Sequence, residues 1–305
     1  MNRTRLILAT ALTTAALALS ACGSGGDPLA APADSPAATD TIVVGSADFA
    51  ENALLAEIYA GALTAKGVKV TKKLNIGSRE TYIPGLEDGS IDLIPEYSGV
   101  LLQYFKKDAT ETSSEDVYKA LPAAVPAQLT VLEQSTAEDK DAIVVTKETA
   151  DKYSLKSIAD LAPVAKDIVF GGPAELKTRP TGLPGMKKIY GLEYKSFKSL
   201  DAGGPLTINA LKKGQVQAAD VFSTDPNIPA NNWVVLDDPK FLFAAQNVVP
   251  LINKAKATPT VTAALNAVSS KLTTPVLADL VKKVVLDKGD PETVAKEFLS
   301  TNGLS

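Results

Sequence analysis

The 305-residue sequence contains no histidine and one cysteine, Cys22. Histidine is the commonest general base and the commonest metal ligand in proteins, so its absence removes the chemistry that many hydrolases and metal sites use. One cysteine permits neither an internal disulfide nor a thiolate zinc cluster. We therefore expect no catalytic triad, no metal site and no cofactor in this chain.

An excess of basic residues is also missing. Asp and Glu number 35 and Lys and Arg 31, which gives a formal net charge of -4. Binding to nucleic acid requires a basic face, so we expect no nucleic-acid partner. With 45% hydrophobic and 22% charged residues, the composition is that of an ordinary globular protein, large enough for one big domain or two smaller ones.

The first 22 residues are typical of an export signal. Arg3 and Arg5 precede an apolar run over 6–19, which is shorter than the about 20 residues that span a bilayer. The run leads to Ser20-Ala21-Cys22, which resembles the lipobox of bacterial lipoproteins, where the cysteine is lipidated. The alternative is a plain secretory signal with an incidental cysteine. We predict that residues 1–22 are a lipoprotein signal peptide and that Cys22 anchors the protein to the extracytoplasmic face of the membrane.

Residues 23–40 form the next segment. They are mostly Gly, Ser, Pro, Ala and Asp, with almost no large apolar side chain. Such a segment cannot bury a core, so we interpret it as a flexible tether and expect the folded part to start near residue 41.

From residue 41 onward the sequence alternates between strand and helix patterns. A β-branched run at 41–45 predicts a buried strand, and Asp48 and Glu51 then stand at the spacing of a capping box. Apolar residues at helical spacing follow as far as Gly67, and further strands are predicted at 68–74 and 91–94. Strands that alternate with helices indicate βαβ units and a largely parallel sheet, so the predicted fold class is α/β.

One part of the sequence is repeated in pattern further along the chain. Segment 86–91 is followed by Tyr97-Ser98 at the same intervals as segment 211–216 is followed by Phe222-Ser223. Any two βα units look alike in this way, but the pattern also fits two similar lobes that each present an aromatic residue to a shared cleft. In open α/β sheets, ligands bind beyond the carboxyl ends of strands, where Tyr97 and Phe222 would lie.

Five motifs then occur in a fixed order along the chain. They are IVVGSADFAE at 42–51, IDLIPEYSG at 91–99, TRPTGLPG at 178–185, LDDP at 236–239 and VVPL at 248–251. In this order they resemble the osmoprotectant (glycine betaine/choline) binding proteins of ABC importers, a quaternary-amine binding family. The resemblance implies a type II periplasmic-binding-protein fold, in which two α/β lobes with a ligand cleft are joined by a two-strand hinge. Residues 41–141 and 247–305 would form the first lobe and residues 142–246 the second.

The resemblance also implies a function. Proteins of this family capture a compatible solute, such as glycine betaine, choline or a related quaternary amine, and deliver it to the transmembrane permease of the importer without altering it. The alternatives are a more polar solute in the same fold, a ligand sensor, or an enzyme built on this fold. The missing histidine argues against the enzyme.

Three candidate site residues follow from the resemblance. Tyr97 and Phe222 match two rings of an aromatic box around a trimethylammonium group, which is attracted to ring faces because it cannot donate a hydrogen bond. Arg179 matches the arginine that binds the ligand carboxylate, for which its planar fork is suited.

At two other box positions the sequence departs from the family pattern. Asp141 stands at one of them and Gln246 or Asn247 at the other, in place of aromatic residues. Ser46, in the opening motif, is a further candidate ligand contact. Asp141 could pair with a cationic ligand such as choline, or these polar side chains could hydrogen-bond a more polar solute. The sequence leaves both possibilities open.

Overall fold

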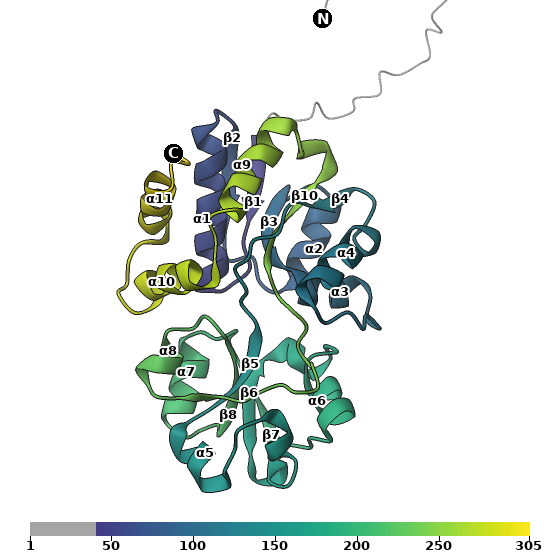
Figure 1. The fold of residues 1–305 in the computed structure, drawn as a ribbon, viewed down its shortest axis with the longest axis vertical. Helices are drawn as coiled ribbons and strands as arrows, with labels where there is room; N and C mark the ends of the chain where they lie inside the picture. Colours follow the sequence, from purple (N-terminus) through teal and green to yellow (C-terminus); the bar gives the residue numbers. More distant parts are fainter. Residues whose placement is uncertain (1–40) are drawn as a thin grey trace, which may run out of the picture. The chain divides into compact units, whose positions relative to one another are not determined.

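The computed structural model describes residues 41–305, which belong to one compact unit (Figure 1). The predicted signal peptide, the lipidation of Cys22 and the predicted tether lie outside the described residues. The chain from residue 41 forms two five-stranded sheets, each with its own helices. None of the helices in this part combines the length and the apolar character that crossing a bilayer requires.

Lobe 1 is the first sheet and the helices around it (Figure 1). Its strands are β1 (Thr41–Gly45), β2 (Lys69–Lys73), β3 (Leu93–Tyr97), β4 (Leu129–Val131) and β10 (Val248–Asn253). They stand in the order β2-β1-β3-β10-β4. Its helices are α1 (Ala50–Ala65), α2 (Arg79–Glu87), α3 (Ser98–Phe105), α4 (Ser114–Ala124), η4 (Lys254–Lys256), α9 (Pro259–Ser269), α10 (Thr274–Val285) and α11 (Pro291–Thr301).

Lobe 2 is the second sheet and its helices. Its strands are β5 (Asp141–Val145), β6 (Val169–Pro173), β7 (Ser196–Leu200), β8 (Ala218–Phe222) and β9 (Val234–Val235). They stand in the order β7-β6-β8-β5-β9. Its helices are α5 (Lys147–Tyr153), η1 (Ile158–Leu161), η2 (Ala165–Asp167), η3 (Ala174–Lys177), α6 (Leu183–Tyr190), α7 (Pro205–Lys212) and α8 (Asn227–Ala230).

Each sheet combines parallel strands with antiparallel ones. In lobe 1, β1 is parallel to β2 and β3, whereas β10 is antiparallel to β3 and β4. In lobe 2, β6 is parallel to β7 and β8, whereas β5 is antiparallel to β8 and β9. The α/β class is confirmed, and the predicted largely parallel sheet is found in each lobe with one exception: β10 in lobe 1 and β5 in lobe 2 run against the other four strands. The chain enters β5 and β10 from the other lobe, at the edge where the parallel strands end, so both must run in the opposite direction.

Apolar side chains pack on both faces of each sheet. Along β3, Leu93 packs among the residues of α1, α9, α10 and α11, and Ile94 packs among those of α2, α3 and α4. Along β5, Ile143 and Val144 likewise belong to clusters on opposite faces. Successive side chains of a strand point to opposite faces, so a strand covered on both sides reads as a continuous apolar run.

Helix α1 does not begin with the predicted capping box. Its N-cap residue is Phe49, which makes no side-chain capping bond. The carboxylate of Glu51 instead accepts hydrogen bonds from the hydroxyls of Tyr97 and Thr224. The prediction from the Asp48–Glu51 spacing is therefore wrong, because tertiary contacts occupy both carboxylate oxygens of Glu51.

Two segments connect the lobes, residues 132–140 and residues 236–247. They meet in an antiparallel bridge between Glu138 and Asn247, next to a hydrogen bond from Asp139 N to Gln246 O of 3.1 Å. We call these two segments the hinge segments. The sequence predicted lobe boundaries at 141/142 and 246/247. Each lies within one residue of the C-terminal end of a hinge segment, at residue 140 or residue 247.

The two serines of the repeated pattern occupy equivalent places beside the hinge segments. Ser98 Oγ accepts a hydrogen bond of 3.0 Å from Asn247 N, and Ser223 Oγ accepts one of 2.8 Å from Lys140 N. Each serine follows the last residue of a strand, β3 in lobe 1 and β8 in lobe 2. The repeated pattern therefore marks two strand ends that each bind one hinge segment.

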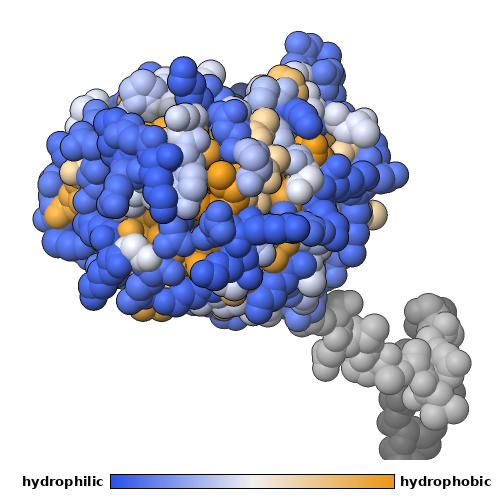
Figure 2. Space-filling model, turned by 90° about the horizontal axis from the view of Figure 1, so that it is seen from below, coloured by the Kyte–Doolittle hydropathy of each residue, from blue (hydrophilic) through white to orange (hydrophobic). Residues whose placement is uncertain are grey.

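Figure 2 shows a face of mostly hydrophilic side chains with apolar residues between them. Exposed large hydrophobic side chains in the described part of the chain are few: Leu206, Val235, Phe241 and Leu286. Single exposed apolar residues are ordinary on a soluble protein. These four residues therefore do not indicate a binding surface on the outside of the protein.

Candidate functional site

A cavity of about 370 Å³ lies where the strand ends of the two lobes meet. Tyr97, the last residue of β3, and Phe222, the last residue of β8, both line it. Its volume is within the range of small-molecule sites, about 300–1,000 Å³. Its position beyond the carboxyl ends of strands is where open α/β sheets bind ligands. We take this cavity as the candidate site.

Three aromatic rings meet at the cavity. The ring of Phe49 lies 6.0 Å from that of Tyr97 and 4.8 Å from that of Phe222, between centroids. Phe49 and Tyr97 belong to lobe 1 and Phe222 to lobe 2, so Phe49 connects the rings of the two lobes. Sequence reasoning missed Phe49. It lies just beyond the carboxyl end of β1, and this position was the signal that could have found it.

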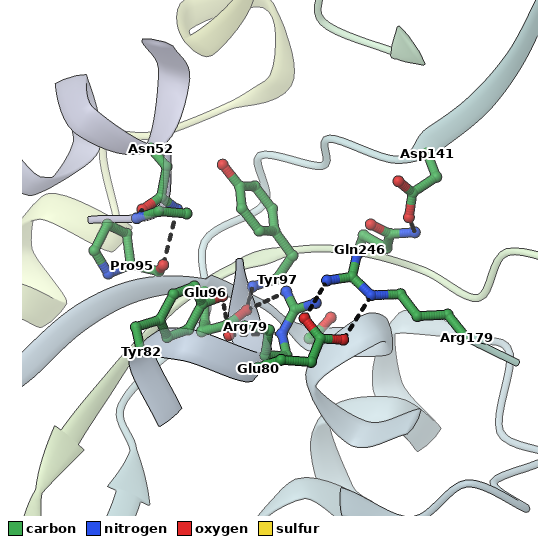
Figure 3. A network of polar contacts seen from close by, with 12 residues as sticks. Asn52, Arg79, Glu80, Tyr82, Pro95, Glu96, Tyr97, Asp141, Arg179 and Gln246 are labelled. Atoms are coloured by element: carbon green, nitrogen blue, oxygen red, sulfur yellow. Dashed lines mark hydrogen bonds and ion pairs between the residues drawn. The ribbon is translucent and has the colours of Figure 1, made fainter. Parts of the chain in front are cut away.

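The turn that carries Phe49 is fixed by Asn52 of α1. Asn52 Oδ1 accepts a hydrogen bond of 2.7 Å from Ala47 N, and its Nδ2 donates one of 2.9 Å to Pro95 O on β3 (Figure 3). Asn52 is 1% exposed. This buried amide therefore ties the Phe49 turn to the strand that ends in Tyr97.

A buried ion pair supports the lobe 1 wall of the cavity. Arg79 donates from Nε to Glu96 Oε1 at 2.8 Å and from Nη2 to Glu96 Oε2 at 2.7 Å (Figure 3). Tyr82 Oη donates to Glu96 Oε1 at 2.7 Å, and Tyr97 N donates to Glu96 Oε2 at 2.9 Å. A bidentate arginine–carboxylate pair constrains geometry as well as charge. The pair therefore fixes the backbone from which the Tyr97 ring projects.

A second buried network binds the hydroxyl of Tyr97, which donates to Glu51 Oε1 at 2.8 Å. The hydroxyl of Thr224, from lobe 2, lies 2.6 Å from Glu51 Oε2 and 3.0 Å from Asp139 Oδ1. Burial raises the pKa of Glu51, and burial together with the negative charge of Glu51 raises the pKa of Asp139 well above its ordinary value. The two carboxyl groups therefore bind a proton more tightly than they would in water, in a contact that joins lobe 1, a hinge segment and lobe 2.

Arg179 lines the cavity, and it is paired with Glu80 of α2. Arg179 Nε donates to Glu80 Oε1 at 3.0 Å and Arg179 Nη2 to Glu80 Oε2 at 2.8 Å (Figure 3). Burial would raise the pKa of Glu80, but the hydrogen bonds and the charge of Arg179 lower it to about 2. The Nε–Nη2 edge of the guanidinium is therefore already bound to a carboxylate of lobe 1, and this pair does not use Nη1.

Asp141 and Gln246 line the cavity side by side. Gln246 Nε2 donates to Asp141 Oδ2 at 3.0 Å (Figure 3). Of the two alternatives that the sequence left for one box position, Gln246 and Asn247, it is Gln246 that faces the cavity. The amide orients the carboxylate of Asp141 at the start of β5.

Two candidate residues do not reach the cavity. Ser46 is fully buried, and its hydroxyl donates to Ala47 O at 3.0 Å and accepts from Asn75 N at 2.7 Å. Asn247 Oδ1 accepts a hydrogen bond of 2.6 Å from Ser114 Oγ of α4, and its Nδ2 donates to Ser135 O. The polar atoms of both side chains have hydrogen-bond partners within the protein, and neither side chain lines the cavity.

The arrangement is suited to binding. It offers three ring faces and several carboxyl groups to a small molecule, and the chain contains no histidine that could serve as a general base. Among residues 41–305, no group of three or more His, Cys, Asp or Glu side chains is placed to hold a metal ion.

Two α/β lobes, two hinge segments and a ligand-sized cavity between the strand ends define a two-lobed solute-binding protein of the type II fold. A crystal structure described as a glycine betaine/carnitine/choline ABC transporter has the same fold, with a TM-score of 0.68 and 24% identity over 86% of this chain and 99% of that one. The chain belongs to the family described as the substrate binding domain of ABC-type glycine betaine transport systems, whose sequence model matches residues 40–301. This confirms both the resemblance and the fold class inferred from the sequence.

Two curated relatives show how far the similarity extends. The glycine-betaine-binding protein of Pseudomonas aeruginosa is 26% identical over 282 residues, which cover 88% of this chain and 90% of that protein. The ergothioneine transport permease/ergothioneine binding protein EgtU of Helicobacter pylori is 26% identical over 269 residues. These residues cover 86% of this chain, which spans about half (48%) of the length of EgtU.

Proposed function

We propose that this protein is the extracytoplasmic solute-binding component of an ABC importer. In this proposal it captures a small quaternary amine in the cavity between its lobes and passes it unchanged to the permease subunit. The observation that carries the proposal is the contact of the Phe49 ring with rings from both lobes. A quaternary ammonium is attracted to such ring faces, with about 0.5–2 kcal/mol for each contact. The names of the relatives support the same ligand class.

The proposed ligand contacts come from both lobes and from a hinge segment. They are Phe49, Tyr97, Asp141, Arg179, Phe222 and Gln246, which all line the cavity. A solute that touches rings of both lobes is bound more strongly when the lobes are close together. Ligand binding would therefore favour the closed form of the protein. The permease has to distinguish this closed, loaded form from the empty protein.

Thermal unfolding with a panel of solutes tests the proposal. The full chain, purified in a non-ionic detergent, is unfolded with glycine betaine, choline, carnitine or proline. At about 100 times its dissociation constant, a ligand should stabilise the folded state by about 2.7 kcal/mol. The matched control is 3,3-dimethyl-1-butanol, the uncharged carbon analogue of choline, which should stabilise the protein much less. The absence of stabilisation by every quaternary amine would refute the ligand class.

The membrane anchor is a separate part of the proposal, and it rests on the sequence Leu19-Ser20-Ala21-Cys22. In bacterial cells, the wild-type chain should fractionate with membranes and incorporate a labelled fatty acid. The Cys22→Ser variant should do neither, because the thiol that would be acylated is gone. Equal labelling of the two chains would exclude lipidation at Cys22.

A further inference from the structure

The cavity has an excess of acidic side chains. Its lining contains two guanidinium groups, those of Arg79 and Arg179, and each is bound to a glutamate at two nitrogen atoms. Six carboxyl side chains also line it: Asp48, Asp139, Asp141, Glu175, Asp201 and Asp220. The positive charges of the wall are therefore compensated within the protein, and the surplus on the wall is acidic.

Three of the six cavity carboxyl groups have hydrogen-bond partners within the protein, but Asp220 differs. It is 2% exposed, and its Oδ1 is buried without a hydrogen-bond partner in the described part of the chain. Asp139, Asp141 and Asp201 accept hydrogen bonds from Thr224, Gln246 and the first turn of α7, respectively. The buried hydroxyl of Tyr194 is also without a partner among the described residues and is affected by the charge of Asp220, but of the two only Asp220 lines the cavity. A buried carboxyl oxygen without a partner is costly, and a solute in the cavity can supply the missing donor.

The register of the strands places Asp220 on the face of the sheet that lines the cavity. Asp220 and Phe222 alternate along β8, so both side chains lie on one face of the sheet. Asp141 of β5 lies opposite Phe222, which makes Asp141 and Asp220 diagonal neighbours on this face. The neighbouring strand β6 has glycine at 171 and 172, and a Cβ atom on Gly172 would lie 3.1 Å from the Asp220 Cβ. This strand therefore has no side chain there that could donate to Asp220.

We infer that Asp220 is a ligand-binding residue, which accepts a hydrogen bond from a donor group of the solute. Together with Asp141, it makes the site select cationic quaternary amines with a hydroxyl over zwitterions with a carboxylate. The inference rests on the proposed function and specifies its substrate. The trimethylammonium group has no hydrogen to donate, so the donor must come from the other end of the solute. A hydroxyl supplies it, whereas a carboxylate would lie beside the acidic side chain of Asp141 and would find the Nε–Nη2 edges of both arginines already paired.

Burial and the charge of Asp141 raise the pKa of Asp220 well above its ordinary value, and the charge of Arg179 acts in the opposite direction. A cation bound in the same cavity stabilises the ionised carboxylate. This is the protonation state that accepts a hydrogen bond from a hydroxyl most strongly.

Choline and glycine betaine are suited to the test, because they share the trimethylammonium group and differ in a hydroxyl against a carboxylate. Titration calorimetry on the full chain in detergent should give a dissociation constant for choline at least about tenfold below that for glycine betaine, as expected when a hydrogen bond to a charged group is replaced by repulsion. Asp220→Asn should weaken choline binding by about tenfold and leave glycine betaine binding unchanged or tighter. Glu80→Gln frees Arg179 and should change the ratio of the two dissociation constants in favour of glycine betaine.

The matched control is Asp225→Asn, which changes a buried aspartate that is hydrogen-bonded to Asn227 and does not line this cavity. It should leave the ratio of the two dissociation constants unchanged. Unaltered choline binding by Asp220→Asn, or tighter binding of glycine betaine than of choline by the wild type, would overturn the inference and leave the proposed function standing. Binding of neither solute would overturn both.

Discussion

Replacing Phe49 by alanine should weaken the binding of a quaternary amine by about tenfold to thirtyfold, which corresponds to the loss of about 1.4–2 kcal/mol of cation–π and apolar contact. Phe49 should matter more than either of its neighbours, because its ring contacts both Tyr97 and Phe222. Its loss removes one ring face and also loosens the other two. Titration calorimetry with the solute that stabilises the protein most in thermal unfolding measures the effect.

Phe49 is half-buried, so a weaker variant could reflect altered packing in place of a lost ligand contact. Phe49→Leu separates the two explanations, because leucine keeps most of the apolar volume but has no aromatic face. We expect it to unfold close to the wild-type temperature and to bind the amine nearly as weakly as the alanine variant. Phe241→Leu, at a phenylalanine that is 61% exposed, should change neither property. Wild-type affinity in Phe49→Leu would show that the ring face does not contribute.

The second large effect concerns pH and the carboxyl pair of Glu51 and Asp139. Asp139 has a raised pKa in the folded protein, so above its ordinary value of 3.8 the folded state retains a proton that the unfolded chain has lost. Raising the pH then favours the unfolded chain, by up to about 1.4 kcal/mol per pH unit for one retained proton. The free energy of unfolding of the wild type should therefore decrease from about pH 5 upward, until the pH passes the pKa in the folded state.

Asp139→Asn tests this dependence. The asparagine carbonyl can still accept the hydrogen bond from Thr224 N, and its amide can donate to Glu51 as a protonated carboxyl would. The variant should therefore unfold with a smaller dependence on pH and should be more stable than the wild type at pH 8. Other buried aspartates, Asp220 among them, also have raised pKa values, so the difference between wild type and variant is the relevant quantity. Parallel pH profiles would rule out a shared proton at this position.

The same carboxyl pair connects the two lobes. Glu51 belongs to lobe 1, Thr224 to lobe 2 and Asp139 to a hinge segment. Across the cavity, the pair of Glu80 and Arg179 makes a second connection between the lobes. Both connections hold the lobes together, so both contribute to the balance between open and closed forms.

Part of the candidate site could be read from the sequence. Tyr97 and Phe222 stand at the ends of strands in a repeated pattern, and a strand end in an open α/β sheet is a defined place. Arg179, Asp141 and Gln246 line the same cavity, although Arg179 is bound to Glu80. Phe49, Arg79 and Asp220 were missed. The place of Phe49 beyond the end of β1 was a usable signal, whereas Arg79 at a helix start and Asp220 inside a short strand carry no local signal of which neighbours they will meet.

What the sequence determined by itself is the family, the α/β class and the two strand ends, because these depend on motifs and on the period of apolar residues along the chain. Only the tertiary structure decided the antiparallel entry of β5 and β10, the withdrawal of Ser46 and Asn247 into lobe 1, and the pairing of both cavity arginines with glutamates. The physical reason is that hydrogen bonds and ion pairs form between residues as distant along the chain as Glu80 and Arg179, and their partners are fixed only when the lobes meet.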